Sequence, residues 1–251
     1  LRQAKPGVSR FLNKRGASPM QIETRHRWDL TNAEARALQI EMAEEVNTTT
    51  PLGDWETVAA ADVSFDKFAT ELYAAVVVCR AKTFEVIERV NVAGPAAFPY
   101  VPGLLSFREA PALIEAFRKL KTRPDVVLCD GQGLAHPRKL GIACHLGLWL
   151  GLPTVGCGKS LLCGDYDEPG PKRGDRSPLT LKGDVIGAVV RTRDRVSPVF
   201  ASPGHLCDLE GAVRLILETA TKYRLPAPTR MVHDYVNVVR LAAKAGEPIP
   251  E

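Results

Sequence analysis

Residues 124–137 read PDVVLCDGQGLAHP, and the rest of the chain is arranged around them. The four apolar residues 126–129 leave no room for a polar helical stripe, so they predict a strand that is buried on both faces, as in parallel sheets. Asp130 ends this strand, and glycines and His136 follow it. Because ligands of open α/β sheets bind beyond the carboxyl ends of strands, Asp130 is a candidate for chemistry. The alternative is a turn aspartate, since Asp-Gly pairs are common in turns.

Size and composition favour a single folded domain. The 251 residues are 45% hydrophobic, which supports a substantial core, and no linker divides them. We expect a basic, disordered N-terminal extension over residues 1–28, a catalytic domain over 29–245 and a C-terminal tail over 246–251. Met20 is a candidate for the natural start.

Charge is distributed unevenly along the chain. Residues 1–19 carry five basic side chains and no acidic one, whereas the remainder is close to neutral. A near-neutral body is not typical of proteins that coat nucleic acid non-specifically, although local basic clusters could bind phosphates. The basic segment is therefore either an unstructured extension or an arm that touches phosphate.

Cysteine usage and hydropathy indicate the compartment. The six cysteines show neither Cys-x-x-Cys spacing nor the density of a disulfide scaffold, which suits a reducing cytosol. No apolar run reaches the roughly 18 residues that a membrane span needs, and the N-terminus lacks a signal-peptide hydrophobic segment. We expect a soluble, cytoplasmic protein without a membrane partner.

The order of predicted elements indicates an α/β fold. A capping box at Thr31 and Glu34 predicts the start of the first helix. The predicted helices cover 32–46, 108–120, 139–150, 208–223 and 229–245, and the predicted strands cover 58–64, 71–81, 84–92, 126–130, 154–160, 179–181, 184–192 and 196–201. Residues 161–178 are expected to form a surface loop. The first three strands suit an antiparallel meander, and the whole order matches a mixed β-sheet of the ribonuclease H-like kind, flanked by helices in a single domain.

Two further acids lie where predicted elements meet. Asp62 falls in a run of small apolar residues in the first strand, where an acid is costly unless it is exposed or faces a cation. Glu109 follows Ser106 in a Ser-x-x-Glu pattern, so it could belong to a helix-capping box or could bind a metal. Both alternatives remain open for each acid.

Two loop motifs also have alternative interpretations. Two prolines bracket Tyr100 and Val101 in the segment Pro99–Pro102, which could form a rigid apolar wedge that unstacks a duplex, or a plain connection with Tyr100 folded back. Gly158, Lys159 and Ser160 suggest a P-loop, but Pro153 replaces its first glycine and no helical pattern follows. Lys159 is then a phosphate contact or a solvent-exposed lysine.

Taken together, four motifs resemble those of the endonuclease V family. They are Ala61-Asp62-Val63, the block from Pro99-Tyr100-Val101-Pro102 through Gly103-Leu104-Leu105-Ser106-Phe107-Arg108-Glu109, the segment Asp130-Gly131-Gln132-Gly133 with Ala135-His136-Pro137, and Gly156-Cys157-Gly158-Lys159. The similarity extends from about residue 30 to 240. The block from tyrosine to glutamate is its most specific part.

The resemblance implies a DNA repair endonuclease that recognises deoxyinosine, the product of adenine deamination, and hydrolyses the second phosphodiester bond on its 3′ side. It would leave 3′-hydroxyl and 5′-phosphate ends. The metal-binding acids then fall on Asp62, Glu109 and Asp130, and the active-site histidine and lysine fall on His136 and Lys159. The wedge falls on Pro99, Tyr100, Val101 and Pro102, and the hypoxanthine pocket falls on Gly103, Leu105, Gly131, Ile142, Gly156 and Leu162. His233 stands where relatives often have aspartate, as a fourth metal ligand.

These residue types suit the implied chemistry. Carboxylates hold Mg²⁺ through oxygen ligands, and Mn²⁺ could substitute for it. His136, with an ordinary pKa of about 6.5, could orient or deprotonate the attacking water. Glycines allow the backbone to approach the edge of a base closely. Two alternatives stay open: inosine-containing RNA as the substrate, or a catalytically silent nucleic-acid-binding module.

Overall fold

The computed structural model describes residues 20–66 and 69–249, so the predicted basic arm or extension over residues 1–19 lies outside the described residues. The helices are α1 (Asn32–Glu44), α2 (Leu105–Lys119), α3 (Ile142–Leu150), α4 (Leu209–Thr219) and α5 (Ala227–Ala245). The strands are β1 (Thr57–Ser64), β2 (Glu71–Arg80), β3 (Val86–Pro95), β4 (Val126–Cys129), β5 (Thr154–Gly158), β6 (Arg176–Leu181), β7 (Asp184–Val190) and β8 (Val199–Pro203). The α/β class and the helix-flanked mixed sheet are confirmed.

All eight of these strands form one sheet in the order β3-β2-β1-β4-β5-β8-β7-β6. The predicted meander of β1, β2 and β3 is antiparallel, and β4 runs parallel to both β1 and β5. Strand β4 is fully buried, as four consecutive apolar residues predict. Its position in the middle of the sheet explains this pattern, because helices cover both of its faces.

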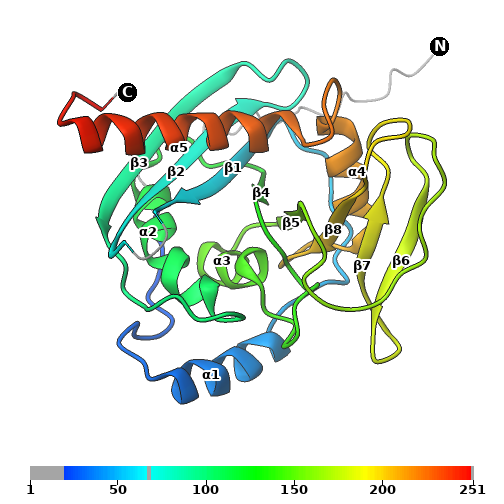
Figure 1. Ribbon diagram of the computed structural model, residues 1–251, viewed down its shortest axis with the longest axis horizontal. Coiled ribbons are helices and arrows are strands. Elements are labelled where there is room, and N and C mark those ends of the chain that lie inside the picture. The colour runs from blue at the N-terminus through cyan, green and yellow to red at the C-terminus, as the bar shows by residue number, and fades with distance from the viewer. Residues whose placement is uncertain (1–19, 67–68, 250–251) are drawn as a thin grey trace, which may run out of the picture.

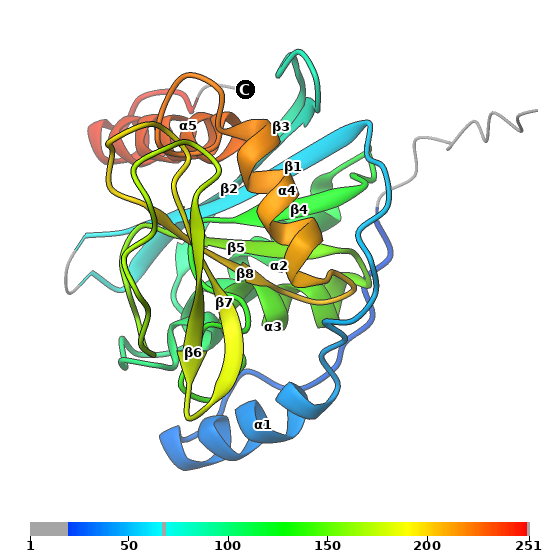
Figure 2. The same ribbon diagram turned by 90° about the vertical axis from the view of Figure 1, so that its right-hand side faces the viewer.

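Helices cover the two faces of the sheet (Figures 1 and 2). On one face, α2 and α3 pack on alternate side chains of the strands, among them Ala59 and Ala61 of β1. On the other face, α5 packs against Ala60 of β1, and α4 packs against Val155 and Cys157 of β5. The alternation along β1 leaves only small side chains between the layers, so the helices approach the sheet closely there.

The segment before α1 packs against this core. Met20 is 7% exposed, and Ile22 and Trp28 contact the same cluster of buried side chains. Part of the predicted N-terminal extension, residues 20–28, therefore lies on the domain. The capping box that begins α1 is confirmed, because Thr31 and Glu34 each accept a hydrogen bond from the other's backbone N–H.

Several predicted boundaries are wrong. Helix α2 begins at Leu105 without a side-chain cap, so the capping box that was one of the two alternatives for Glu109 does not form with Ser106. The Ser106 hydroxyl instead lies 3.0 Å from Nδ1 of His145. Helix α3 begins at Ile142 rather than near residue 139, and β6 begins at Arg176, inside the predicted loop.

The structure shows the state of the cysteines and the character of the helices. All six cysteines are free, and five of them are buried. Among the residues that the structure describes, no helix is long and apolar enough to cross a membrane.

Candidate active site at the edge of the sheet

Two aspartates meet where β1 and β4 lie side by side. Ala61 of β1 stands opposite Cys129 of β4 in the parallel ladder, so the residues that follow them, Asp62 and Asp130, reach the same edge. The backbone N–H of Asp130 donates to the Ala61 carbonyl at 3.3 Å. Both carboxylate side chains are largely covered, with side-chain exposures of 11% and 10%.

A histidine from α5 completes a compact group. The Nδ1 atom of His233 lies 2.9 Å from Oδ2 of Asp62. Single ligand atoms of Asp62, Asp130 and His233 all lie within 4.8 Å of one another, a spacing that could hold a metal ion. Three of the four residues predicted as metal ligands are thus close together in the structure.

Glu109 faces the two aspartates from α2. Burial raises the pKa of its carboxyl to about 8, with further contributions from the charges of Asp62 and Asp130 and an opposing one from Arg108. Burial, and then the charge of Asp130, also raises the pKa of Asp62, while the hydrogen bond from His233 lowers it. Glu109 is not part of the compact group within 4.8 Å. We call Asp62, Glu109, Asp130 and His233 together the acidic edge.

The electrostatics of the acidic edge suit a divalent cation. Burial, and then the negative charge of neighbouring aspartates, raises the proton affinity of Asp62 and Glu109, and a hard cation with oxygen ligands relieves this kind of repulsion. Lys159, at the end of β5, supplies one positive charge through an ion pair of 2.5 Å between Nζ and Oδ2 of Asp130. Its side chain is 39% exposed, so it lies at the rim of the site.

Neighbouring residues orient His233. Nδ2 of Asn237, one turn further along α5, lies 3.2 Å from Nε2 of His233. The hydroxyl of Ser64, at the end of β1, donates to Oδ1 of Asn237 at 2.9 Å. This chain of contacts fixes the imidazole plane relative to β1.

His136 lies in a different environment from the acidic edge. Its Nδ1 accepts the backbone N–H of Arg138 at 3.2 Å, and its ring also hydrogen-bonds to the backbone of Gly103. Burial, followed by the charge of Arg138, lowers its pKa to about 4. The ring is therefore neutral at physiological pH, and its neighbours are the Gly103 loop and Arg138.

Only some of the residues predicted to form the base pocket lie close to one another. A Cβ atom on Gly131 would lie 2.8 Å from Cγ2 of Ile142, and one on Gly156 would lie 2.8 Å from the Gly131 carbonyl oxygen. These three residues therefore lie together beside Asp130. Leu105 occupies the first turn of α2, whereas Leu162 is 50% exposed on the surface.

The predicted wedge projects from a firmly anchored loop. Tyr100 is 61% exposed, and its ring meets that of Phe65 edge to face at 6.4 Å. The residues on either side of the wedge, Phe98 and Leu104, are 3% and 0% exposed. The chain thus leaves the core before Pro99 and re-enters it after Pro102. Of the two alternatives for Tyr100, the exposed ring and not the folded-back ring is the one that the structure has.

Two residues near the wedge went unnoticed in the sequence. Gln39 of α1 is completely buried and donates to the carbonyls of Gly103 and Leu140 at 3.1 and 2.9 Å. Arg138 donates to the Gly103 carbonyl at 2.6 Å. Gln39 stands four residues after buried Ala35, and a polar side chain on the apolar face of a helix is the signal that could have revealed it.

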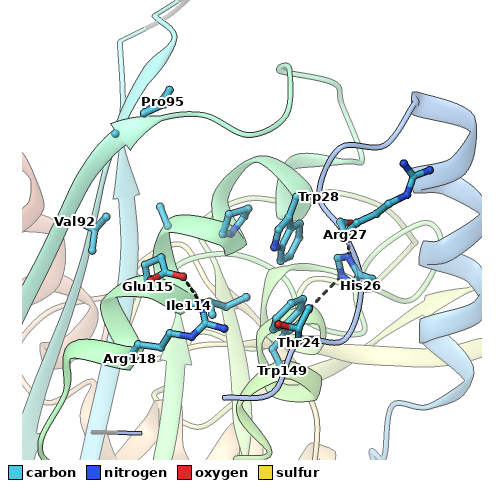
Figure 3. A pocket seen from close by; sticks show the side chains of 13 residues that line it. Thr24, His26, Arg27, Trp28, Val92, Pro95, Ile114, Glu115, Arg118 and Trp149 are labelled. Atoms are coloured by element: carbon cyan, nitrogen blue, oxygen red, sulfur yellow. Dashed lines mark hydrogen bonds and ion pairs between the residues drawn. The ribbon is translucent and has the colours of Figure 1, made fainter. Parts of the chain in front are cut away.

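A cavity of about 450 Å³ lies away from the acidic edge, between β3, α2 and the segment before α1 (Figure 3). Beside it, the rings of Trp28 and Trp149 stack at 5.0 Å, and Trp149 donates to Nε2 of His26 at 3.2 Å. Nε2 of the same histidine lies 2.9 Å from Nε2 of His145. We call these rings, with that of Phe107, the aromatic cluster: His26, Trp28, Phe107, His145 and Trp149.

Comparison with known proteins gives a consistent result. The Endonuclease V family model matches residues 40–234. The Endonuclease V of Azotobacter vinelandii is 48% identical over 204 residues, which are 81% of this chain and 92% of that protein. The crystal structure of Endonuclease V from Streptomyces avermitilis has a TM-score of 0.82 at 39% identity, over 87% of this chain and 96% of that one. Endonuclease V of Ciona intestinalis, in complex with DNA containing an inosine followed by a ribo-adenosine, has a TM-score of 0.73 at 26% identity, over 86% and 98% of the two chains.

The protein is an α/β nuclease, which is a class of hydrolase. Its mixed sheet, the carboxylates at the edge of that sheet and the relatives described above define this class. The match covers most of the chain and extends across the motifs that carry Asp62, Glu109 and Asp130. The chain belongs to the Endonuclease V family.

Proposed function

We propose that the protein is a metal-dependent DNA repair endonuclease that recognises deoxyinosine and hydrolyses the second phosphodiester bond on its 3′ side. The observation that carries this proposal is the meeting of Asp62, Asp130 and His233 within 4.8 Å, in a chain of the Endonuclease V family. The products would be a 3′-hydroxyl and a 5′-phosphate. The Ciona intestinalis relative, with its bound inosine-containing DNA, supports the class of substrate.

Asp62, Glu109 and Asp130, together with the His233 imidazole, would hold Mg²⁺, and Mn²⁺ could replace it. When bound, such a cation polarises the phosphate and lowers the pKa of a bound water. The protein's own contribution would be to bring Asp62 of β1 beside Asp130, which follows β4, with Glu109 of α2 facing both. Their mutual repulsion favours cation binding, because an empty site keeps like charges together in a covered place.

Lys159 is the proposed phosphate contact. Its ammonium group lies beside Asp130 at the rim, where a phosphodiester oxygen could take the place of the carboxylate as its partner. Such an exchange would bring the scissile phosphate next to the acids. The proposed catalytic set consists of Asp62, Glu109, Asp130, His136 and Lys159. In the structure, His136 hydrogen-bonds to the backbone of Gly103.

Recognition of the base would use the wedge and the glycine cluster. Tyr100 is exposed enough to enter a base stack, since 61% of its surface is free. Gly131 is partly exposed beside Ile142, and Gly156 has no side chain where the backbone of residues 131–133 packs against it. Amide groups of this segment could therefore hydrogen-bond the edge of an extruded hypoxanthine while Ile142 covers its face. Gly103, Leu105 and Leu162 complete the proposed pocket.

A nicking assay tests the proposal directly. End-labelled DNA with one deoxyinosine is incubated with Mg²⁺ or with EDTA, beside an undamaged duplex. We expect Mg²⁺-dependent cutting at the second bond 3′ of the lesion. Lesion binding without any product would instead favour the silent binding module, and cutting elsewhere would refute the proposed position of the cut.

One observation favours RNA as a second substrate. The DNA bound to the Ciona intestinalis relative carries a ribo-adenosine after the inosine, so its complex contains a 2′-hydroxyl next to the lesion. The same assay with a matched inosine-containing RNA separates the two substrates. Cutting of RNA alone would move the proposed function from DNA repair to RNA turnover.

A further inference from the structure

The loop that carries the wedge is held at both of its ends by buried side chains. At its start, the Phe98 carbonyl accepts Nη1 of Arg108 at 2.9 Å, and Arg108 is only 6% exposed. At its end, the Gly103 carbonyl accepts Nε2 of Gln39 at 3.1 Å and Nη2 of Arg138 at 2.6 Å. The exposed tip between these two points is therefore tied to the core at a short distance on each side.

The two attachment points lead to different parts of the site. Arg108 directly precedes Glu109 on α2, so the start of the wedge loop is fixed relative to the acidic edge. Gln39 also holds the Leu140 carbonyl, in the loop that runs from Asp130 to α3. Arg138 belongs to that same loop and bonds to the side-chain oxygen of Gln39. The end of the wedge loop is thus fixed relative to the loop beside the base pocket.

The side chain of Gln39 is fully used in this arrangement. Its nitrogen donates to two carbonyls and its oxygen accepts from Arg138. A fully buried amide that makes all of these bonds is rigid, because leaving any of its groups unpaired would be costly.

We propose that Gln39 and Arg138 are positioning residues that hold the wedge at a fixed distance from the base pocket, and so determine how well the enzyme distinguishes deoxyinosine from normal bases. This inference rests on the proposed function. A wedge held in place can unstack the duplex at the point from which the lesion reaches the pocket. A loosened wedge would unstack it less effectively.

The conformation of Gly103 fits this role. Its φ angle is +77°, a region that favours glycine, and an added Cβ atom would lie 2.8 Å from Nη2 of Arg138. The turn therefore favours glycine through its φ angle, and a side chain at residue 103 would displace the guanidinium of Arg138 from its present position. His136 also hydrogen-bonds to the backbone of Gly103, which adds a third group at this point.

The test compares Gln39→Met, which keeps the side-chain volume and removes every polar bond, with Thr219→Val. Thr219 is a buried hydroxyl on α4 that bonds only within its own helix, so it controls for the loss of a buried hydrogen bond. A 2-aminopurine next to the deoxyinosine reports unstacking by its fluorescence in EDTA, without any cutting. We expect Gln39→Met to give less than half of the wild-type fluorescence rise at saturating protein, and Thr219→Val to give the full rise.

Cleavage kinetics give a second measurement. We expect Gln39→Met to lower kcat/KM on deoxyinosine DNA by between about tenfold and a hundredfold, the size of effect that a misplaced group produces. In the background Tyr100→Ala, the same substitution should have little further effect, because both act through the wedge. An equal fluorescence rise in wild type and Gln39→Met, or additive losses in the double variant, would overturn the inference. If the wild-type protein neither unstacks nor cuts the DNA, the proposed function itself fails.

Discussion

The acidic edge and the aromatic cluster both contain covered titratable groups, yet they are built on opposite principles. At the acidic edge, burial and then the charge of neighbouring aspartates raise the pKa of Asp62 and raise that of Glu109 to about 8. In the aromatic cluster, the pKa of His145 lies well below its ordinary value because the ring is buried, and both of its nitrogens have partners at 2.9 and 3.0 Å. A shifted pKa thus points to a reactive or ion-binding site where several carboxylates converge. It points to a structural role where the shifted ring is buried and both of its nitrogens have partners.

The largest effect should come from removing one charge at the acidic edge. We expect Asp130→Ala to lower the rate of cutting by about a thousandfold or more, because it removes a central cation ligand. Binding of deoxyinosine DNA in EDTA should stay within a few-fold of wild type, since the wedge and the pocket are intact. A gel-shift assay and the nicking assay measure the two quantities on one preparation. Near wild-type cutting would show that the metal assignment is wrong.

The aromatic cluster should respond to substitution in stability and not in chemistry. We expect His145→Ala to lower the free energy of unfolding by about 3 kcal/mol, because it opens a cavity and removes one hydrogen-bond partner each from Ser106 and His26. Urea titration followed by circular dichroism measures this loss. Cutting by the folded variant at low temperature should remain within about twofold of wild type. A stable variant that does not cut would connect the aromatic cluster to catalysis and remove the contrast.

Acid should weaken the protein through its neutral histidines. The unfolded chain binds a proton on each histidine near pH 6.5, whereas His145 and His136 stay neutral in the fold, the latter until about pH 4. At these two positions the unfolded state therefore binds more protons, and their contribution to stability falls as the pH decreases below about 6.5. Glu109, whose pKa in the fold is about 8, contributes with the opposite sign over the same range. Each such histidine contributes a loss of about 1.4 kcal/mol one pH unit below that point.

Urea titrations in EDTA at pH 7.5, 6.5 and 5.5 measure this dependence. The variant His145→Phe should show a shallower fall than wild type, since one proton-linked group is gone. A pH dependence in His145→Phe as steep as that of wild type would contradict the burial of a neutral histidine at this position.

The smallest effect on stability should follow from Tyr100→Ala. Because 61% of this residue is exposed, we expect the free energy of unfolding to change by no more than about 0.5 kcal/mol. Affinity for deoxyinosine DNA should fall clearly in the same variant. A large loss of stability would mean that Tyr100 belongs to the core, and the wedge would then need another residue.

The central strand and its acid were predictable because both depend on local patterns. Four consecutive apolar residues predict a strand that is buried on both faces, and β4 is buried in this way. Because β1 and β4 are parallel, the acids at their carboxyl ends reach the same edge of the sheet. The start of α3 was not predictable from local patterns. Its preceding loop is held by distant partners, including the bond from the Gly133 N–H to the Ser202 hydroxyl.

The same reasoning explains what was missed in the site. The Ser-x-x-Glu pattern at Ser106 is a valid capping signal, but the hydroxyl finds a partner in His145, 39 residues later. Gln39 lies 64 residues from Gly103 and 101 residues from Leu140, so no local pattern reports its bonds. Strand ends and helical periodicity can be read from the sequence, whereas the partners of a buried polar side chain depend on the tertiary structure.

The contact between Asp62 and His233 spans 171 residues, and His233 lies on α5, the last helix of the chain. During synthesis on the ribosome, the three acids leave the exit tunnel well before this helix does. A growing chain can therefore have its carboxylates without the imidazole that bonds to Asp62 and without the helix that covers β1 and β2. The order of translation thus delays completion of the acidic edge until α5 has been made.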